Sequence, residues 1–377
     1  MYAAVVQRAG AVSTSASSRI PSPVAEGGVP WPQLVPDVIP GALVAYGWGE
    51  RVVALFNDLA DPGDEPARVV RAERSQSVVV SGDGRDHRVT GPSPPAVGDW
   101  VVLHDGVIRH VLPRWSAVTR RDPGGARDQV LAANADLVII TAPADRLSPA
   151  RVERELAVAW DSGARPLVVL TKADVAAPEA RVELEARLAG VDVVETSVTT
   201  GAGIDSVAEW LRPDRTAVLL GPSGAGKSSL ANALLGSERL ATGTVRDADH
   251  RGRHTTTTRQ LVAVPGGGVL IDTPGLRSLA LSDGVTGAID QVFPEIDQLA
   301  ADCRFADCSH EVEPGCAVTA AVAGGGLAPA RLESFRKLQK EAAAAARRVD
   351  PLLRKAELSV WKARTKSVRA NNRRKPR

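Results

Sequence analysis

The sequence predicts three domains of different class: a small antiparallel β-barrel, a central α/β domain on a parallel sheet, and a mainly helical C-terminal domain. Three observations lead to this prediction. Five short alternating apolar and polar runs lie within residues 66–118, a strand, a glycine-rich loop and a helix follow one another over residues 217–235, and all three cysteines lie within residues 303–316. A chain of 377 residues with 44% hydrophobic side chains is long enough for two or three such cores.

We place the domain boundaries where the composition changes. The expected order is a leader over residues 1–65 that is largely disordered at its start, a barrel over 66–120, the α/β domain over 130–284, and the helical domain with a basic tail over 285–377. Residues 1–40 are rich in Ala, Ser, Pro and Val and carry few charges, a composition typical of disorder. A transit peptide is the alternative interpretation of this leader, because Arg8 and Arg19 accompany few acidic residues.

The five runs in residues 66–118 predict five short strands. Tight turns are indicated at residues 81–84 and 104–106, where Gly and Asp cluster. Five strands with glycine turns are typical of a barrel of the OB type. Arginines at 68, 71, 74, 85 and 88 would make one region of it basic.

The most specific pattern is a phosphate-binding loop. Residues 221–228 read Gly-Pro-Ser-Gly-Ala-Gly-Lys-Ser and match G-x-x-x-x-G-K-[ST] at every fixed position. In such a loop, backbone N–H groups and a helix N-terminus bind phosphates. Lys227 would reach the β- and γ-phosphates and act in catalysis, and the Ser228 hydroxyl would hold magnesium. The residues expected to bind phosphate are Gly221, Pro222, Ser223, Gly224, Ala225, Gly226, Lys227, Ser228 and Ser229.

Two further strand-end motifs complete a nucleotide site. Asp272-Thr-Pro-Gly275 places a carboxylate toward the magnesium ion and a glycine N–H toward the γ-phosphate. Thr171-Lys172-Ala-Asp174 ends another apolar strand, and a carboxylate there can accept two hydrogen bonds from the N–H edge of guanine. Adenine lacks that pair of donors, so the motif favours GTP over ATP. Ser197, after a predicted strand at residues 191–194, fits the loop behind the guanine.

The order of these motifs is inverted. In an ordinary GTPase the phosphate loop precedes the guanine-reading motif, whereas here Asp174 precedes Lys227. A site needs groups placed in space rather than in sequence order, so the same sheet can be cut elsewhere and rejoined. The central domain is therefore predicted to be a circularly permuted P-loop GTPase.

A mobile switch is expected between the phosphate loop and Asp272. Residues 251–258 contain four consecutive threonines, and either Thr255 or Thr256 would coordinate magnesium when the γ-phosphate is present. Leu276 stands where many GTPases have a water-orienting glutamine, and leucine cannot orient water. Either His254 orients the water, or hydrolysis waits for an activating partner.

The cysteines predict one structural zinc ion. Cys303, Cys308, His310 and Cys316 follow the spacing C-x₄-C-x-H-x₅-C. Three thiolates and one imidazole form a closed tetrahedral set. An odd cysteine count argues against a disulfide framework.

Charge is unevenly distributed along the chain. The net charge is +2, yet residues 331–377 hold sixteen Lys and Arg against four acidic residues, an excess of twelve positive charges. Such a tail is typical of contact with a nucleic-acid backbone, although a solvated tail is the simpler alternative. No run of eighteen apolar residues occurs, so we expect no membrane span and no membrane partner. We also expect the protein to be cytoplasmic and monomeric.

A barrel, a permuted GTPase and a Cys₃His module with a basic tail together resemble the ribosome-small-subunit-dependent GTPase A family. The resemblance covers roughly residues 66–370, and its most specific parts are residues 221–228, 252–256 and 272–275 and the four metal ligands. It implies binding to the 30S subunit and its 16S rRNA in late maturation, rRNA-stimulated hydrolysis of GTP to GDP and phosphate, and a role for His254 in hydrolysis. Thr171 and Ser77 depart from the pattern, since many relatives have Asn at the first position and an aromatic residue at the second.

Two alternatives remain open from the sequence. One is a permuted GTPase that acts on an RNA other than that of the small subunit. The other is a nucleic-acid-binding protein whose nucleotide site is only structural, against which the intact Lys227, Ser228 and Asp272 argue.

Overall fold

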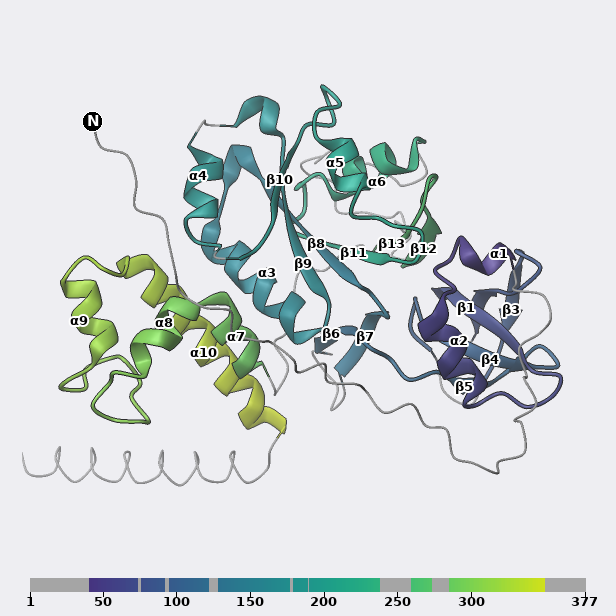
Figure 1. Cartoon of the computed structure of the whole chain (residues 1–377), viewed down its shortest axis with the longest axis horizontal. Helices are drawn as coiled ribbons and strands as arrows, with labels where there is room; N and C mark the ends of the chain where they lie inside the picture. Colours follow the sequence, from purple (N-terminus) through teal and green to yellow (C-terminus); the bar gives the residue numbers. More distant parts are fainter. Residues whose placement is uncertain are drawn as a thin grey trace, which may run out of the picture. The chain divides into compact units, whose positions relative to one another are not determined.

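The computed structural model describes residues 41–73, 76–91, 95–121, 128–176, 179–188, 190–237, 259–272 and 285–349. Within these residues, one sheet of eleven strands has the order β10-β9-β8-β11-β13-β12-β1-β2-β3, with β4 and β5 joined to it through β1 (Figure 1). The leader at 1–40, most of the basic tail and the switch at 251–258 lie outside the described residues.

Five parallel strands form one end of this sheet: β8 (Leu137–Pro143), β9 (Arg165–Thr171), β10 (Val193–Thr196), β11 (Thr216–Leu220) and β13 (Val269–Asp272). β12 (Gln260–Ala263) runs antiparallel to β13. The sheet is therefore mixed, where a parallel sheet was expected. β10 begins two residues later than expected, because its pairing with β9 begins with Val193 opposite Val168.

Helices cover both faces of the parallel strands, which explains their continuous apolar sequences. Side chains alternate along a strand, so neighbouring residues of β8 enter different cores. Val138 and Ile140 belong to the core that includes α3, whereas Leu137 and Ile139 belong to the core that includes α5 and α6. The helical segments of this domain are η1 (Ala144–Arg146), α3 (Pro149–Asp161), η2 (Ala173–Val175), α4 (Ala180–Glu185), α5 (Ile204–Ala208) and α6 (Lys227–Leu235).

Five antiparallel strands precede this domain: β1 (Glu65–Ala72), β2 (Ser77–Val80), β3 (Asp86–Val89), β4 (Trp100–His104) and β5 (Val107–Val111). They pair in the order β3-β2-β1-β4-β5, and a parallel bridge between Thr90 and Val107 joins the end of β3 to β5. Their facing apolar side chains form a separate small core. Two short helices, α1 (Gly41–Val44) and α2 (Glu50–Asn57), lead into β1.

Two contacts of β1 help to attach the five strands to the α/β domain. β1 pairs with β12 through Arg71 and Gln260. Arg68, only 1% exposed, donates a 2.7 Å hydrogen bond from Nη2 to the hydroxyl of Thr216, at the start of β11. Burial lowers the pKa of Arg68 to about 10, so the guanidinium remains charged at neutral pH.

The rest of the described chain is a β-hairpin and a group of helices. The hairpin pairs β6 (Ala117–Arg121) with β7 (Asp128–Ala133), and the helices are α7 (Thr286–Val292), α8 (Pro294–Ala300), α9 (Ala317–Ala323) and α10 (Pro329–Val349). α10 begins at Pro329, since proline is favoured at the first position of a helix. Among the residues described, no helix has both the length and the apolar character needed to cross a membrane.

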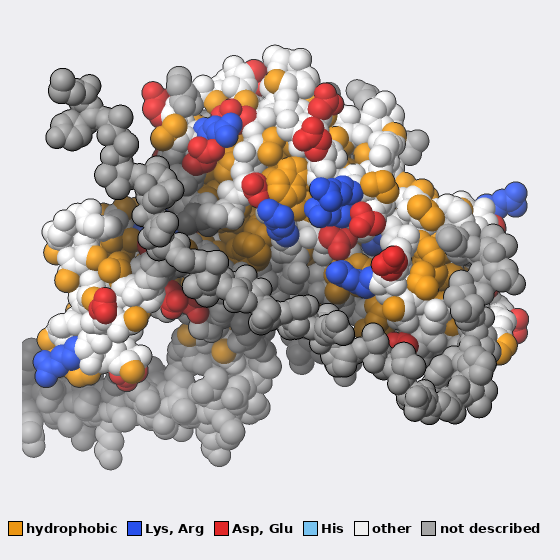
Figure 2. All heavy atoms as spheres, viewed as in Figure 1, with side chains coloured by type: hydrophobic (Ala, Val, Ile, Leu, Met, Phe, Trp, Pro, Cys, Tyr) orange, Lys and Arg blue, Asp and Glu red, His pale blue; other side chains and the backbone are white. Residues whose placement is uncertain are grey.

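Charged side chains of both signs are mixed on one face of the molecule (Figure 2). On the face drawn in Figure 2, Lys and Arg lie among Asp and Glu and do not form one continuous basic area. In the sequence, residues 331–377 hold the excess of twelve positive charges, and residues 350–377 lie beyond the described part.

Candidate nucleotide site and metal centre

The separated nucleotide motifs meet at one edge of the sheet. Parallel strands end at the same edge, and β9, β11 and β13 carry the guanine motif, the phosphate loop and Asp272 at their carboxyl ends. The hydroxyl of Thr171 donates a 2.7 Å hydrogen bond to the carbonyl oxygen of Ala225, inside the phosphate loop. The inverted order along the sequence therefore does not separate the motifs in space.

The phosphate loop has a backbone that glycine makes possible. Gly221 has φ +138°, and a Cβ atom there would lie 2.2 Å from the hydroxyl oxygen of Thr141. Gly226 has φ +86° and precedes α6, which begins at Lys227. Residues with a Cβ atom rarely adopt backbone conformations with positive φ, so both glycines are needed for the chain to turn sharply from β11 into α6.

Lys227 lies over the loop that it follows. Its Nζ donates hydrogen bonds of 2.8 Å to the carbonyl oxygens of Gly221 and Pro222. Burial lowers the pKa of Lys227, while the carboxylates of Glu155 and Asp272 act in the opposite direction. Phosphate oxygens that took the place of the two carbonyls would favour the charged amine.

Glu155, on α3, is an acidic residue near this lysine that no motif indicated. It is 5% exposed and lies 3.2 Å from Arg151, one turn earlier on the helix. Burial raises its pKa, and Arg151 partly offsets this effect. The nucleotide-binding edge thus holds paired charges on α3 as well as the motif residues.

The guanine motif has an unusual backbone. Lys172 has φ +59°, in the left-handed region that non-glycine residues seldom adopt, and it precedes η2, which carries Asp174. Its Nζ lies 2.8 Å from a carboxylate oxygen of Asp145. Ser197 is buried directly after β10, the neighbour of β9, and its hydroxyl accepts a hydrogen bond from the Thr200 N–H at 3.2 Å.

Other expected site residues can be placed only in part. Ser228 and Ser229 lie in the first turn of α6, and Asp272 ends β13. His254, Thr255, Thr256 and Gly275 lie outside the described residues.

Sequence patterns missed Asp145 and Arg146. Arg146 contacts the phosphate loop, donating from Nη2 to the carbonyl oxygens of Gly224 (3.0 Å) and Ser223 (3.3 Å). The one available signal was position, since both residues follow β8 at the edge where the motif-bearing strands end.

The four expected metal ligands lie together. The ligand atoms of Cys303, Cys308, His310 and Cys316 are all within 4.8 Å of one another. Nδ1 of His310 lies 3.6 Å from Sγ of Cys303 and 3.5 Å from Sγ of Cys316, and these two sulfurs are 3.9 Å apart. Tetrahedral zinc would require about 3.6 Å between nitrogen and sulfur and about 3.8 Å between sulfurs. The donor set, and the spacing of Cys303, His310 and Cys316 within it, therefore fit a tetrahedral ion.

The local backbone supports this cluster. His310 has φ +57°, and its carbonyl oxygen accepts a hydrogen bond from Arg336 of α10. Cys316 caps α9, and its sulfur accepts from the Thr319 N–H at 3.4 Å. Burial raises the pKa of Cys316, but hydrogen bonds from Thr319 and His310 outweigh it and lower the pKa to about 6.

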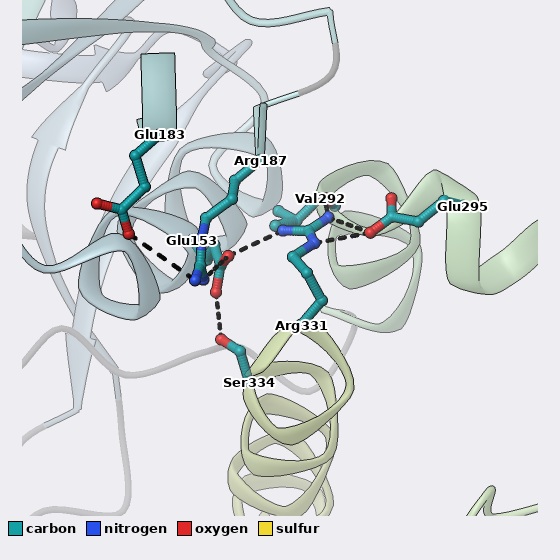
Figure 3. Close-up of polar contacts among 7 residues, drawn as sticks. All are labelled: Glu153, Glu183, Arg187, Val292, Glu295, Arg331 and Ser334. Atoms are coloured by element: carbon teal, nitrogen blue, oxygen red, sulfur yellow. Dashed lines mark hydrogen bonds and ion pairs between the residues drawn. The ribbon is translucent and has the colours of Figure 1, made fainter. Parts of the chain in front are cut away.

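A buried network connects α3 with the C-terminal helices (Figure 3). Glu153 of α3 is fully buried and accepts hydrogen bonds from Nη1 of Arg331 (2.9 Å) and from the hydroxyl of Ser334. Arg331 also donates to the Val292 carbonyl oxygen at 2.9 Å and from Nε to Glu295 at 2.7 Å. One guanidinium thereby holds α3, the end of α7 and α8 to α10.

The fold and the order of the motifs along it define a circularly permuted GTPase. The RsgA GTPase family profile matches residues 111–282. The chain is 48% identical over 318 residues to the small ribosomal subunit biogenesis GTPase RsgA of Streptomyces coelicolor, covering 80% of this chain and 86% of that protein. It is 44% identical over 360 residues to the same-named protein of Opitutus terrae, covering 88% and 98% of the two chains. The chain belongs to the RsgA GTPase family and is a GTP-hydrolysing enzyme.

Solved structures show the same fold. The crystal structure of YjeQ from Thermotoga maritima aligns with a TM-score of 0.57 and 26% identity, covering 74% of this chain and 98% of that one. The crystal structure of YloQ, a circularly permuted GTPase, aligns with a TM-score of 0.53 and 22% identity over 74% of this chain and 95% of that one. These alignments confirm the permuted GTPase fold expected from the motif order.

Proposed function

We propose that this protein binds the small (30S) ribosomal subunit in the cytoplasm as a monomer and hydrolyses GTP on it in late maturation. The observation that carries the GTP site is the hydrogen bond from Thr171 to Ala225, because it joins the guanine motif to the phosphate loop. The names of the relatives, small ribosomal subunit biogenesis GTPases, support the choice of partner.

In this proposal Asp174 accepts the N–H groups of guanine, Ser197 lies behind the base, and the loop at 221–229 binds the phosphates. Lys227 leaves its two carbonyl partners and contacts the β- and γ-phosphates. Water attacks the γ-phosphorus, and the bond from that phosphorus to the β–γ bridging oxygen breaks, giving GDP and phosphate. Magnesium, when bound, would neutralise charge on the phosphates, and Ser228, Asp272 and Thr255 or Thr256 are the residues that would hold it.

We assign the orientation of the attacking water to the side chain of His254. The side chain of Leu276 has no polar atom that could orient water. The resemblance to the ribosome-small-subunit-dependent GTPase A family supports this role for the histidine. Gly275 would donate its N–H to the γ-phosphate. Loss of that phosphate would then release the segment that follows Asp272.

The metal centre is proposed to hold one structural zinc ion through Cys303, Cys308, His310 and Cys316. Four protein ligands leave no position open for a substrate. The ion would fix the loop at 303–316 beside α9 and α10.

RNA contact is assigned to two parts of the chain. The strand order β3-β2-β1-β4-β5, with the parallel bridge from Thr90 to Val107 returning to β3, supports a five-stranded barrel of the OB type over residues 66–120. Exposed Arg85 and Arg88 belong to it. The second part is the basic tail of the domain at 285–377, with sixteen basic residues from 331 onward that favour 16S rRNA phosphates.

The network around Arg331 supports a route from nucleotide to RNA-binding surface. α7 follows the segment after Asp272, and its last carbonyl oxygen is held by Arg331, which also binds Glu153 of the GTPase domain. Movement after hydrolysis would be passed through α7 to α10. Because the coupling between two binding sites is reciprocal, binding to the 30S subunit should then raise the affinity of the protein for GTP more than its affinity for GDP. Equal 30S affinity in both nucleotide states, at one salt concentration, would refute this coupling.

The proposed function is tested by GTP hydrolysis with purified 30S particles, 50S particles, free RNA and buffer alone. We expect 30S particles, and none of the other additions, to raise the rate of GTP hydrolysis. The Lys227→Ala variant should lose this stimulation. Arg165→Ala is the matched control. Arg165 is the first residue of β9, at the amino end of the parallel strands and away from the nucleotide motifs, and it pairs with Asp192. Stimulation by another RNA would favour the first alternative, and undiminished hydrolysis by Lys227→Ala would refute the assigned site.

A further inference from the structure

Two consecutive charged residues lie between the two halves of the nucleotide site. Asp145 and Arg146 belong to η1, directly after β8. β8 lies between β9 and β11 in the sheet, so its carboxyl end is flanked by the guanine motif and by the phosphate loop. The roles assigned above use neither residue.

Arg146 acts on the backbone of the phosphate loop. Its Nη2 donates to the carbonyl oxygens of Gly224 and Ser223 at 3.0 and 3.3 Å. In a planar trans peptide the N–H points away from the carbonyl of the same peptide group. By holding these two carbonyls, the guanidinium fixes the direction of two loop N–H groups. The Gly224 N–H is of the kind that binds phosphate in such loops, whereas the Ala225 N–H donates to the carbonyl oxygen of Pro222 at 3.2 Å in this structure.

Asp145 acts on the guanine motif. Its carboxylate lies 2.8 Å from Nζ of Lys172, whose backbone is in the left-handed conformation with φ +59°. That conformation is unfavourable for a residue with a Cβ atom, so it persists where neighbouring contacts maintain it. Lys172 immediately precedes η2, and therefore sets the path of the chain that carries Asp174.

We propose that Asp145 and Arg146 are positioning residues of the GTP site: Arg146 orients the phosphate-loop N–H groups, and Asp145 holds Lys172 and the guanine-reading turn. This inference rests on the proposed guanine-nucleotide site. The two residues act from the outside of the site, whereas Thr171 joins the same two segments from its buried side.

The test compares three ligands on the full-length chain: GDP, guanosine, which occupies only the base subsite, and pyrophosphate, which occupies only the phosphate subsite. Arg146→Ala should weaken GDP and pyrophosphate binding by about tenfold and change guanosine binding by less than about twofold, the size expected for charge-assisted hydrogen bonds. Asp145→Asn should weaken GDP and guanosine by about threefold and spare pyrophosphate, as expected for a half-exposed ion pair.

Two further variants separate positioning from other effects. Arg146→Lys keeps the charge but not the planar fork of donors, and should stay about threefold below the wild type for pyrophosphate. Arg165→Ala is the control, because Arg165 is as exposed as Arg146 (56% and 55% of the side chain) and lies at the other edge of the strands. It should bind all three ligands as the wild type does.

The outcomes that overturn the proposal are distinct from those that overturn the site itself. Wild-type pyrophosphate binding by Arg146→Ala or Arg146→Lys, or equal losses for all three ligands, would refute the positioning role of Arg146. Unchanged guanosine binding by Asp145→Asn would refute that of Asp145. If Lys227→Ala also binds pyrophosphate normally, the phosphate-loop assignment fails, which is a different result.

Discussion

The Thr171 hydroxyl is joined to the Ala225 carbonyl oxygen by a 2.7 Å hydrogen bond between residues 54 positions apart. Thr171 is only 4% exposed, and β8 separates its strand from the one that leads into the phosphate loop. Many members of the family that the sequence resembles have asparagine at this position, and threonine lacks the amide that would connect it to the loop. The threonine hydroxyl makes this connection.

Removing that hydroxyl is expected to weaken nucleotide binding. Thr171→Val keeps the shape but leaves the buried Ala225 carbonyl without this donor, so GDP affinity should fall about tenfold. Thr171→Ser retains the hydroxyl and should bind GDP within about twofold of the wild type. Titration with a fluorescent GDP analogue measures both. Equal affinities for the valine and serine variants would show that the bond does not position the loop.

Loss of Glu153 is expected to destabilise the chain strongly. Glu153→Ala leaves the buried guanidinium of Arg331 without one of its carboxylates, and breaking a buried pair costs about 3–5 kcal/mol. Glu183→Ala is the matched control from the same network, because Glu183 is 56% exposed and lies 4.0 Å from Arg187. Its cost should be below about 1 kcal/mol. Urea unfolding measures both, and similar midpoints for the two variants would contradict the importance of the network.

Metal removal should affect the C-terminal part of the chain selectively. Chelation, or Cys308→Ser, should abolish binding of one zinc ion per chain and expose the loop at 303–316 to protease. GDP binding should persist, because the hydrogen bonds that hold the nucleotide site, from Thr171 to Ala225 and from Lys227 to Gly221, involve no residue of that loop. Metal analysis, limited proteolysis and GDP titration follow the three effects. Resistance of the loop to protease after complete chelation would argue against a structural ion, and adding zinc back is the control for damage.

Acid is expected to weaken the turn between β2 and β3. The Asp83 carboxylate accepts hydrogen bonds from the Arg85 N–H and the Ser81 hydroxyl, and the first of these is the main reason that its pKa is lowered to about 2. A carboxyl whose folded pKa is depressed stabilises the fold above its unfolded pKa, about 3.8, and loses that effect as the pH falls toward 2.

The difference in melting temperature between the wild type and Asp83→Asn should therefore be largest above about pH 5 and shrink between about pH 4 and pH 2. Thermal unfolding at several pH values measures it. A difference that stays constant over this range would contradict the lowered pKa.

The sequence by itself determined the chemistry of the sites. A glycine-rich loop before a helix, an Asp at a strand end and four sulfur and nitrogen ligands at short spacing are local patterns, and their residue types suffice to predict phosphate and metal binding. The inverted order of Asp174 and Lys227 was also enough to predict a permuted GTPase fold, because parallel strands end at one edge whatever their order.

Only the tertiary structure decided which residues hold those sites in place. The antiparallel β12, the bond from Thr171 to Ala225, the contacts of Asp145 and Arg146, and the pairing of Glu153 with Arg331 leave no local pattern. Glu153 and Arg331 lie 178 residues apart, and each looks like a surface charge on an amphipathic helix. Their burial and partners depend on how helices pack on the sheet, which is decided by contacts between distant segments and not by the spacing of neighbouring residues.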